Sequence, residues 1–140
     1  MLDFPARGKI LRIDGDFAVF NPVNTNYELH LLFAKGQAPT VLNQQVWVYI
    51  RATARKVWTV PSGGNFVTPI FGTPKIAQGR VKHVEGQQMV LHAGVPIYVT
   101  LPKDDTSFDL INGALAVSGL VNVTIMPGAT IEMAPEPAAV

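Results

Sequence analysis

The 140-residue sequence contains no cysteine, so disulfide bonds, thiolate metal ligands and cysteine nucleophiles are excluded. Charged residues are also scarce, at 15% against the roughly 25% usual for globular proteins. The formal net charge of +1 gives no overall attraction to nucleic acid or to membranes. Because 48% of the residues are hydrophobic, the chain can still fill a core.

The longest uncharged segment lies between Asp109 and Glu132 and is 22 residues long, which is enough to span a bilayer. Glycine, proline, asparagine and serine interrupt it repeatedly, so we predict strands there and no membrane contact. The start of the chain has Asp3 and Pro5 where a signal peptide needs a basic start and an apolar run. We therefore predict no signal peptide, which favours the cytoplasm and leaves the compartment open.

Acidic residues are absent between positions 29 and 84, a segment that carries seven basic residues. Residues 85–140 have the opposite balance, with one basic and six acidic residues. Such asymmetry points to an anionic partner for the middle segment or to contact between oppositely charged parts of the protein.

An internal repeat is the main pattern in the sequence. Residues 8–20 (GKILRIDGDFAVF) match residues 79–91 (GRVKHVEGQQMVL) at a constant offset of 71 positions. The same offset relates Tyr27 to Tyr98, Val46 to Val117 and Ile50 to Val121. A spacing kept over some fifty residues predicts an internal duplication.

Each copy begins with a predicted β-hairpin, because Asp14-Gly15 and Glu85-Gly86 separate two β-prone runs. The apolar residues before each turn are three positions apart, which predicts a bulge in each first strand. This hairpin resembles the first hairpin of several small barrels, including the hydrogenase-maturation chaperones. Those chaperones use a cysteine after the initiator methionine, where this chain has Leu2, so the resemblance implies a barrel and none of their chemistry.

The clearest strand covers residues 46–55, where apolar and polar side chains alternate over ten positions. A separate short strand is predicted at 57–60, and in the second half strands are predicted at 79–84, 88–92, 95–101, 115–125 and 129–133. The alternation predicts which side chains point into the core: Val46, Val48, Ile50, Ala52, Val117, Val121 and Val123.

These patterns predict an all-β protein made by internal duplication, with two similar five-stranded OB-like or SH3-like barrels. The expected domains are a first barrel repeat at residues 1–61 and a second at 79–133. Between them, residues 62–78 form a Pro/Gly-rich linker that is apolar enough to lie across the barrels and pack there. Residues 34–45 are expected to be a long connection that could contain a helical turn, and residues 134–140 a flexible tail.

The outward face of the 46–55 strand is the best candidate binding surface. Aromatic rings can stack on bases while guanidinium groups neutralise phosphates, as in single-strand-binding OB barrels. The alternative is that linker aromatics or a second subunit cover these rings, because large aromatic residues also dominate protein contacts. The candidate residues are Trp47, Tyr49, Arg51, Arg55, Lys56 and Trp58.

Metal or catalytic sites receive little support from the sequence. The histidines His30, His83 and His92 lack zinc-type spacing, although the last two flank the second hairpin and could approach one another. The acidic residues at 104–109 predict a solvated loop more readily than a cation site. We therefore predict no cofactor, no metal and no enzymatic activity.

Three classes of function remain. The first is an assembly or protein-interaction module that associates through the apolar linker and through the unlike charges of the middle and end segments. The second is binding of single-stranded nucleic acid or another polyanion by the first repeat. The third, a small hydrolase or lyase using the 104–109 loop, has no nucleophile motif to support it.

Overall fold

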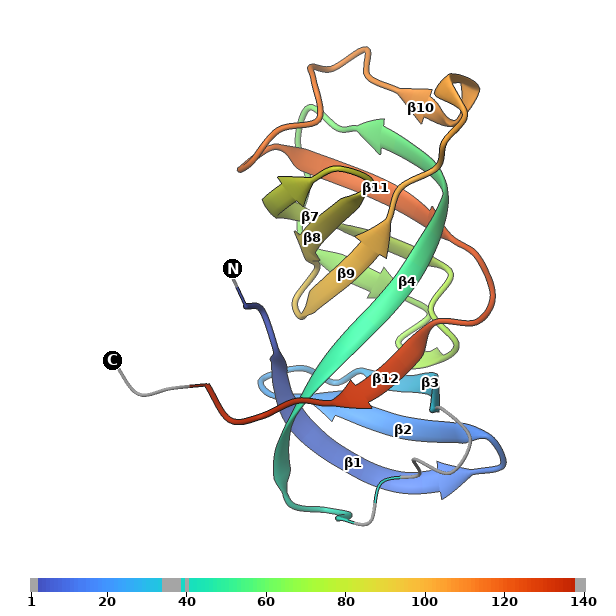
Figure 1. Ribbon diagram of the computed structural model, residues 1–140, viewed down its shortest axis with the longest axis vertical. Helices are drawn as coiled ribbons and strands as arrows, with labels where there is room; N and C mark the ends of the chain where they lie inside the picture. The colour runs from blue at the N-terminus through green and yellow to red at the C-terminus, as the bar shows by residue number, and fades with distance from the viewer. Residues whose placement is uncertain (1–2, 34–38, 40, 138–140) are drawn as a thin grey trace.

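The computed structural model describes residues 3–33, 39 and 41–137 (Figure 1). Apart from one short 3₁₀ helix, η1 (Asp105–Ser107), the regular structure in these residues is β-strand, which confirms the predicted all-β class. No helix in this part of the chain is long and apolar enough to cross a membrane. The strands are β1 (Ala6–Asp14), β2 (Phe17–Pro22), β3 (Glu28–Phe33), β4 (Gln45–Thr59), β5 (Phe66–Thr68), β6 (Phe71–Gly72), β7 (Ile76–Glu85), β8 (Gln88–His92), β9 (Pro96–Thr100), β10 (Phe108–Asp109), β11 (Leu120–Ile125) and β12 (Thr130–Met133).

Strand β4 is a single element of 15 residues, although the sequence predicted two strands at 46–55 and 57–60. Lys56 pairs with Thr124 on β11 while Ala54 pairs with Ile125, so Arg55 is an extra residue in the ladder. A bulge of this kind shifts the alternation by one position without ending the strand. Arg55 and Lys56 lie where the two predicted strands adjoin, and the structure has this bulge there.

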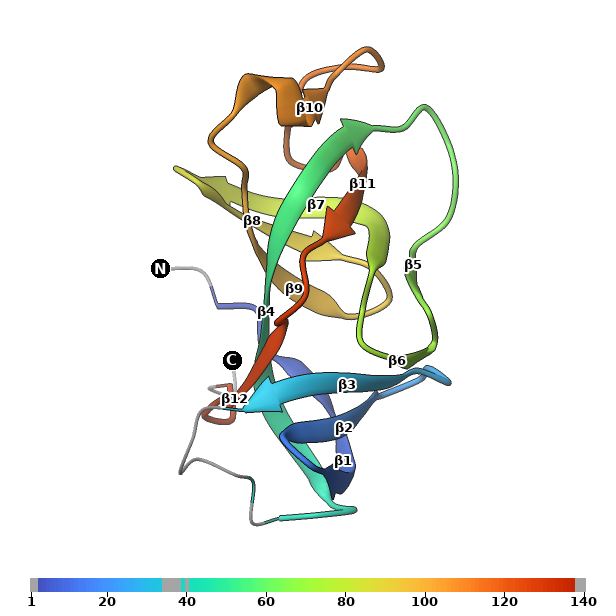
Figure 2. The same ribbon diagram turned by 90° about the vertical axis from the view of Figure 1, so that its right-hand side faces the viewer.

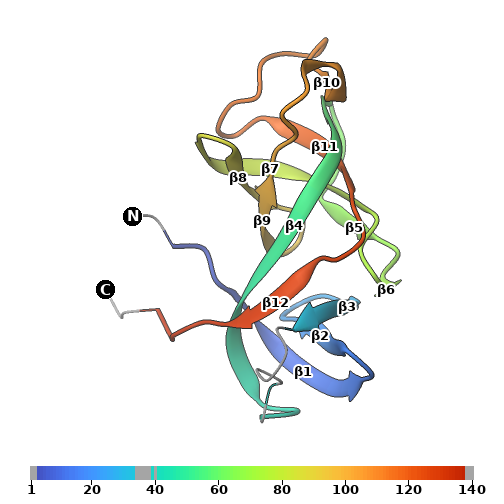
Figure 3. The same cartoon turned by 45° about the vertical axis from the view of Figure 1, so that its right-hand side comes forward.

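The hydrogen-bonded strands close two rings. The first ring runs β1–β2–β3–β12–β4 and returns to β1. The second ring runs β7–β8–β9–β4–β11 and returns to β7. Strand β4 belongs to both rings, and it runs along the molecule from the first ring at the bottom of Figures 1 and 3 to the second ring at the top.

The two rings exchange their fifth strands, which the sequence did not predict. The C-terminal part of β4 completes the second ring, where Arg51, Ala52 and Thr53 pair with β9. In return β12, which follows the second ring's strands in the chain, pairs with β3 and with the first part of β4. The expectation that each half completes its own five strands is therefore wrong. Hydrophobic periodicity specifies the buried face of a strand but not the strand beside it.

The offset of 71 positions applies to the first two strands of each ring and then changes. Val19 pairs with His30, whereas Val90 pairs with Tyr98, so the third strands correspond at an offset of 68 and Tyr98 corresponds to His30. The predicted correspondence of Tyr27 with Tyr98 is wrong for this reason. Both predicted bulges are confirmed, because each ladder shifts register there, after Ile10 in β1 and after Val81 in β7.

The fourth strands correspond at an offset of 75, because the connection before β11 is longer. Gly8 pairs with Val46 in the first ring and Gly79 pairs with Val121 in the second. The sequence had matched Val46 with Val117 and Ile50 with Val121 instead. A change in connection length leaves the local strand patterns intact but moves the register between them.

One connected cluster of buried side chains draws on both rings. Val48, Ile50 and Ala52 are buried as predicted, and Val46 packs against the cluster from its edge. Val121 and Val123 are also buried. Val117 is 57% exposed, so its predicted core position is wrong. The strand begins only at Leu120, because a turn with Gly119 N–H donating to the Ala116 carbonyl precedes it.

The linker crosses from one ring to the other, as the sequence predicted (Figure 2), but it packs only in part, because Val67 is buried while Ile70 and Phe71 are 37% and 57% exposed. Its strand β5 pairs with β7 of the second ring, and β6 pairs with β3 of the first. The buried Tyr27 hydroxyl accepts a hydrogen bond from Val67 N–H and donates one to the Ala93 carbonyl. This tyrosine therefore connects the first ring, the linker and the second ring.

The two irregular segments lie partly outside the described residues. In the 34–45 connection, positions 34–38 and 40 lie outside, which includes part of any helical turn expected there, and residues 41–44 form no strand. In the 134–140 tail, positions 138–140 lie outside, and residues 134–137 form no strand or helix.

Gly8 and Gly79 occupy corresponding positions where two backbones meet closely. A Cβ atom at Gly8 would collide with the Asn21 carbonyl oxygen, and one at Gly79 would collide with the His92 carbonyl oxygen. We expect Gly79→Ala to lower the free energy of unfolding by about 1–3 kcal/mol, as overpacking does in other cores. Urea denaturation followed by tryptophan fluorescence measures this change.

Gly64→Ala is the matched control, because a Cβ at Gly64 meets no atom within 4 Å. It should leave the urea midpoint nearly unchanged. Equal destabilisation by the two substitutions would contradict the close approach of β7 to the β8 backbone.

Candidate functional site

Tyr49, Arg51 and Tyr98 form a compact group on the outer face where β4 meets β9. Arg51 pairs directly with Tyr98 in the parallel ladder, so alternation puts these side chains on the same side. The guanidinium carbon of Arg51 lies 5.5 Å from the centroid of the Tyr49 ring and 5.2 Å from that of Tyr98. The two rings meet edge to face, with centroids 5.7 Å apart. Both cation–π contacts fall within the distance at which they stabilise.

The first described residues of the chain lie against this group. The Tyr49 hydroxyl donates a 2.7 Å hydrogen bond to the Asp3 carboxylate, and Phe4 N–H donates to the Tyr98 hydroxyl at 2.9 Å. The Phe4 ring stacks on the His83 imidazole, with centroids 6.4 Å apart. The bond to the Asp3 carboxylate raises the pKa of Tyr49, because it favours the protonated phenol.

Arg51 also forms an ion pair with Glu132 on β12, with 3.6 Å between Nε and Oε2. The pair joins the basic middle of the chain to its acidic end, one of the two uses predicted for the charge asymmetry. Both side chains are about half exposed, so the pair contributes at most about 1 kcal/mol to stability.

Beside Arg51 is a hollow of about 400 Å³, between the N-terminal segment, β4 and the β7–β8–β9 strands. Its lining carries charges of both signs, because Asp3 and Glu85 line the same hollow as Arg51. His83 faces it as well, and its Nε2 lies 3.9 Å from Glu85 Oε2. These carboxylates would repel a phosphate chain that approached Arg51.

The other predicted binding residues lie elsewhere along β4. Trp47 is half-buried under Arg7, whose guanidinium carbon is 5.8 Å from its ring. Trp58 and Lys56 line a separate hollow of about 380 Å³ against residues 106–110. Trp47 and Trp58 are eleven residues apart, roughly 35 Å of strand at about 3.3 Å per residue. Arg55 is exposed at the bulge. The six residues therefore do not form one platform.

Four residues of this site were missed from the sequence: Asp3, His83, Glu85 and Tyr98. Only the period-two alternation of residues 96–100 could have placed Tyr98 on an outer face. The parallel pairing of β4 with β9 that brings it to Arg51 leaves no local signal in sequence. His83 and His92 do not meet, because His83 pairs with Val90 while His92 pairs with Arg80.

The acidic loop at 104–109 forms its own turns. The Asp104 carboxylate accepts a hydrogen bond from Thr106 N–H, which lowers the pKa of Asp104, and Asp109 accepts one from Ile111 N–H. Within the described part of the chain, no three acidic or histidine side chains are close enough together to hold a metal ion.

Comparisons with known proteins found no matching family model, no similar curated protein and no similar solved structure. The class that the structure defines is therefore an all-β protein with a mixed sheet. Its function has to be argued from its surfaces.

The hydrogen bond between Tyr49 and Asp3 gives a pH-dependent prediction. The raised pKa of Tyr49 means that the folded protein holds the phenol proton more tightly than the unfolded chain does. The resulting stability is present below the ordinary tyrosine pKa of about 10 and is lost as the pH rises through the folded-state value. Asp3→Asn should lower the pKa of Tyr49, which NMR titration of the tyrosine ring carbons measures directly.

Asp16→Asn serves as the control, because it removes the same charge from an exposed residue in the β1–β2 turn. It should leave the pKa of Tyr49 unchanged. If Asp3→Asn also left the pKa of Tyr49 unchanged, the hydrogen bond between Tyr49 and Asp3 would be contradicted.

Proposed function

We propose that this chain is a non-catalytic assembly module that associates head to tail with further copies of itself. The observation that carries the proposal is the 85% exposure of Ile111 on an ordered loop. Its neighbour Leu110 is 41% exposed. Ile111 and Leu110 together expose a small aliphatic patch, and burying the Ile111 side chain against a partner would contribute up to about 3 kcal/mol.

Several hydrogen bonds hold the loop in place. Asn112 donates to Thr59 twice, from its backbone N–H to the hydroxyl and from its side-chain amide to the carbonyl. Gly113 N–H donates to the Leu110 carbonyl, and β10 pairs with β4. A loop anchored in this way presents Ile111 in one position, which reduces the entropic cost of binding.

The complementary surface is an apolar hollow of about 410 Å³ beside the linker, away from the loop. Phe17, Leu32, Pro74 and Ile125 supply most of its apolar lining, and Lys75 lies at its edge. Asp105 and Asp109 precede Ile111 in the sequence, and we propose that docking brings these carboxylates toward Lys75. The proposed contact would use the apolar linker and the unlike charges of the middle and end segments.

Such a contact joins two different surfaces of identical chains, so it repeats from copy to copy. The 110–113 loop lies beyond the second ring at one end of the long axis, whereas the β11–β12 connection lies beside the middle (Figure 1). Heterologous contacts of this kind close into rings or extend as filaments. A second copy is therefore the occupant that we assign to the hollow.

For architecture, we propose that the two five-strand rings are small OB-like or SH3-like barrels that arose by internal duplication. Support comes from the shared order of pairings, the corresponding bulges and the matched pair Gly8 and Gly79. The residue ranges 1–61 and 79–133 are then the repeats, and 62–78 is the segment that connects them.

Nucleic-acid binding by the β4 face is the less favoured function. Arg51 is already paired with Glu132, and the hollow beside it is lined by the Asp3 and Glu85 carboxylates, whose negative charge disfavours a polyanion. Fluorescence quenching by a single-stranded oligonucleotide at low salt tests it. A tight, steeply salt-dependent response that Arg51→Ala weakens would favour nucleic-acid binding over assembly.

We expect Ile111→Ser to raise the dissociation constant of self-association at least tenfold, because a buried aliphatic anchor is lost. Sedimentation velocity over a range of concentrations measures this. Ile13→Ser is the matched control, since Ile13 is 37% exposed on β1 and lies outside both surfaces. A wild-type protein that stays monomeric at high concentration would overturn the proposal.

The charge pairing has its own test. Lys75→Glu should weaken association, and adding Asp105→Lys should restore part of it, because the repulsion becomes attraction again. Sedimentation of the single and double variants at low salt measures the coupling. If the two substitutions had independent effects, Ile111 would dock on another surface.

A further inference from the structure

A further hollow, of about 580 Å³, lies between the two rings and shares no lining residue with the three hollows described above. Its walls are the β2–β3 loop of the first ring and the β8–β9 turn of the second. Its volume falls within the range typical of small-molecule sites.

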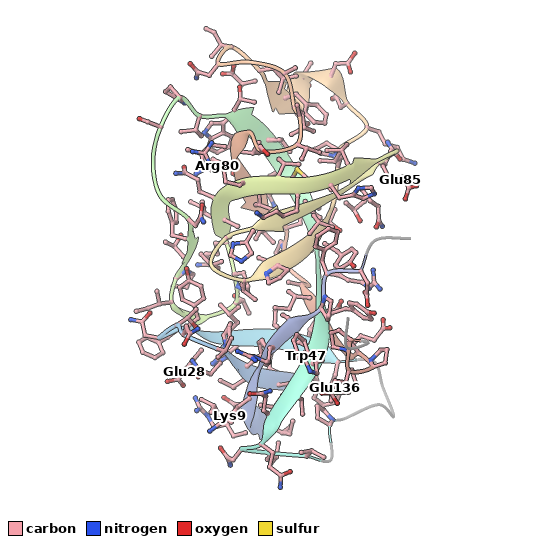
Figure 4. All side chains as sticks on the ribbon, turned by 90° about the vertical axis from the view of Figure 1, so that its left-hand side faces the viewer. Lys9, Glu28, Trp47, Arg80, Glu85 and Glu136 are labelled. Atoms are coloured by element: carbon pink, nitrogen blue, oxygen red, sulfur yellow. The ribbon has the colours of Figure 1, made fainter. Side chains whose placement is uncertain are left out.

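The hollow has basic and amide side chains but no carboxylate in its lining. Arg7, whose guanidinium also lies over the Trp47 ring, and His92 supply the basic side chains, and Asn24 and Asn26 supply amides. This distinguishes it from the hollow beside Arg51, which contains two carboxylates. Arg80 pairs with His92 across the β7–β8 ladder, and Figure 4 shows Arg80 on the second ring and Lys9 on the first, on either side of the level where the rings meet.

The loop that carries the two asparagines is built by hydrogen bonds within the first ring. The Asn21 amide donates to the carbonyls of Thr25 and Tyr27, and Val23 N–H donates to the Arg7 carbonyl. Asn24 has a positive φ of 61°, a conformation that asparagine tolerates well. The loop backbone is therefore held in place, and it carries the exposed Asn24 and Asn26 side chains at the hollow.

On the second ring, Gly94 brings the β8–β9 turn against Tyr27. Its φ is +82°, and a Cβ there would lie 3.0 Å from the Tyr27 hydroxyl oxygen. Val95 and Pro96 follow, and with Val23 they supply the apolar part of the lining, although Val95 itself is almost fully buried. The hollow thus has a polar cationic part and an apolar part.

We propose that this hollow binds a small organic anion whose phosphate or carboxylate group meets Arg7 and His92. Arg7 provides the planar fork of donors that binds either group with two parallel hydrogen bonds. The amides of Asn24 and Asn26 donate to the remaining oxygens, and the apolar wall contacts the organic part. Because the walls come from both rings, the bound anion bridges them.

His92 makes this binding pH-dependent. Burial lowers the pKa of His92, and the Lys82 ammonium lowers it further. The charged groups around it are cations, namely Lys82 and Arg80 on β7 and Arg7 on β1, while the facing loop and turn are uncharged. A bound anion stabilises the imidazolium and raises the pKa of His92, so affinity increases as the pH falls through that value.

The experiment uses the full chain and NMR titration with phenyl phosphate, benzoate and phenol. Both anions should shift the amide signals of Asn24 and Gly94 and the ring signals of His92. Phenol, which has the same ring without the anionic group, should bind at least tenfold more weakly. The stronger of the two anions identifies the ligand group, whereas equal binding of phenol would overturn the proposal.

Arg7→Met should weaken binding of the anion about tenfold, and Arg7→Lys should recover part of the loss because the charge returns. Lys9→Gln is the matched control, since it removes one charge from an exposed residue of the same strand outside the hollow. Equal losses in Arg7→Met and Lys9→Gln would show diffuse attraction and overturn the site.

His92→Gln should reduce the pH dependence to the titration of the ligand itself, which wild type and variant share. Asn24→Gly keeps the positive φ and removes only the amide, so it tests the site without disturbing the fold. It should weaken binding while leaving the thermal midpoint unchanged. Unchanged affinity in both His92→Gln and Asn24→Gly would also overturn the proposal.

Discussion

The sharing of β4 between two rings is the constraint on which the rest of the structure depends. A strand has two hydrogen-bonding edges, and β4 pairs with a different strand on each edge at Val48, Arg51, Val57 and Trp58. Arg51 is the crossing point, because it pairs with Thr130 of the first ring and with Tyr98 of the second. Neither ring can separate from the other without breaking main-chain hydrogen bonds, and the single core cluster extends through both. We therefore expect the protein to unfold in one cooperative step.

Local features of this fold could be read from the sequence, whereas the partners of the strands could not. The alternation of residues 46–55 identified Val48, Ile50 and Ala52 as core, and the three-residue apolar spacing identified both bulges. Val117 was misplaced because the predicted strand was extended back to residue 115, whereas a turn delays β11 until Leu120. The exchange of β4 and β12 leaves no mark on either strand, because both rings offer an apolar interior.

The same division applies to the sites. Tyr49 and Arg51 were found because they alternate with core residues, but Tyr98, Asp3 and Glu85 reach them through long-range pairing. The junction of the rings similarly joins Arg7 and His92, which are 85 positions apart in sequence. Surfaces assembled from both halves are the expected outcome of a fold whose halves exchange strands, and sequence patterns within one half cannot reveal them.

The place of β12 in the first ring has a consequence for synthesis on the ribosome. β1, β2, β3 and the first part of β4 emerge early, but their ring remains open until residues 130–133 pair with β3 and β4. Closure thus requires contacts between residues about a hundred positions apart. The chain entropy lost in closing so long a loop slows folding. A nascent chain stopped before β12 would expose the edges of β3 and β4, and such edges recruit strands from other chains. The first ring can therefore be completed only after β12 has left the ribosome.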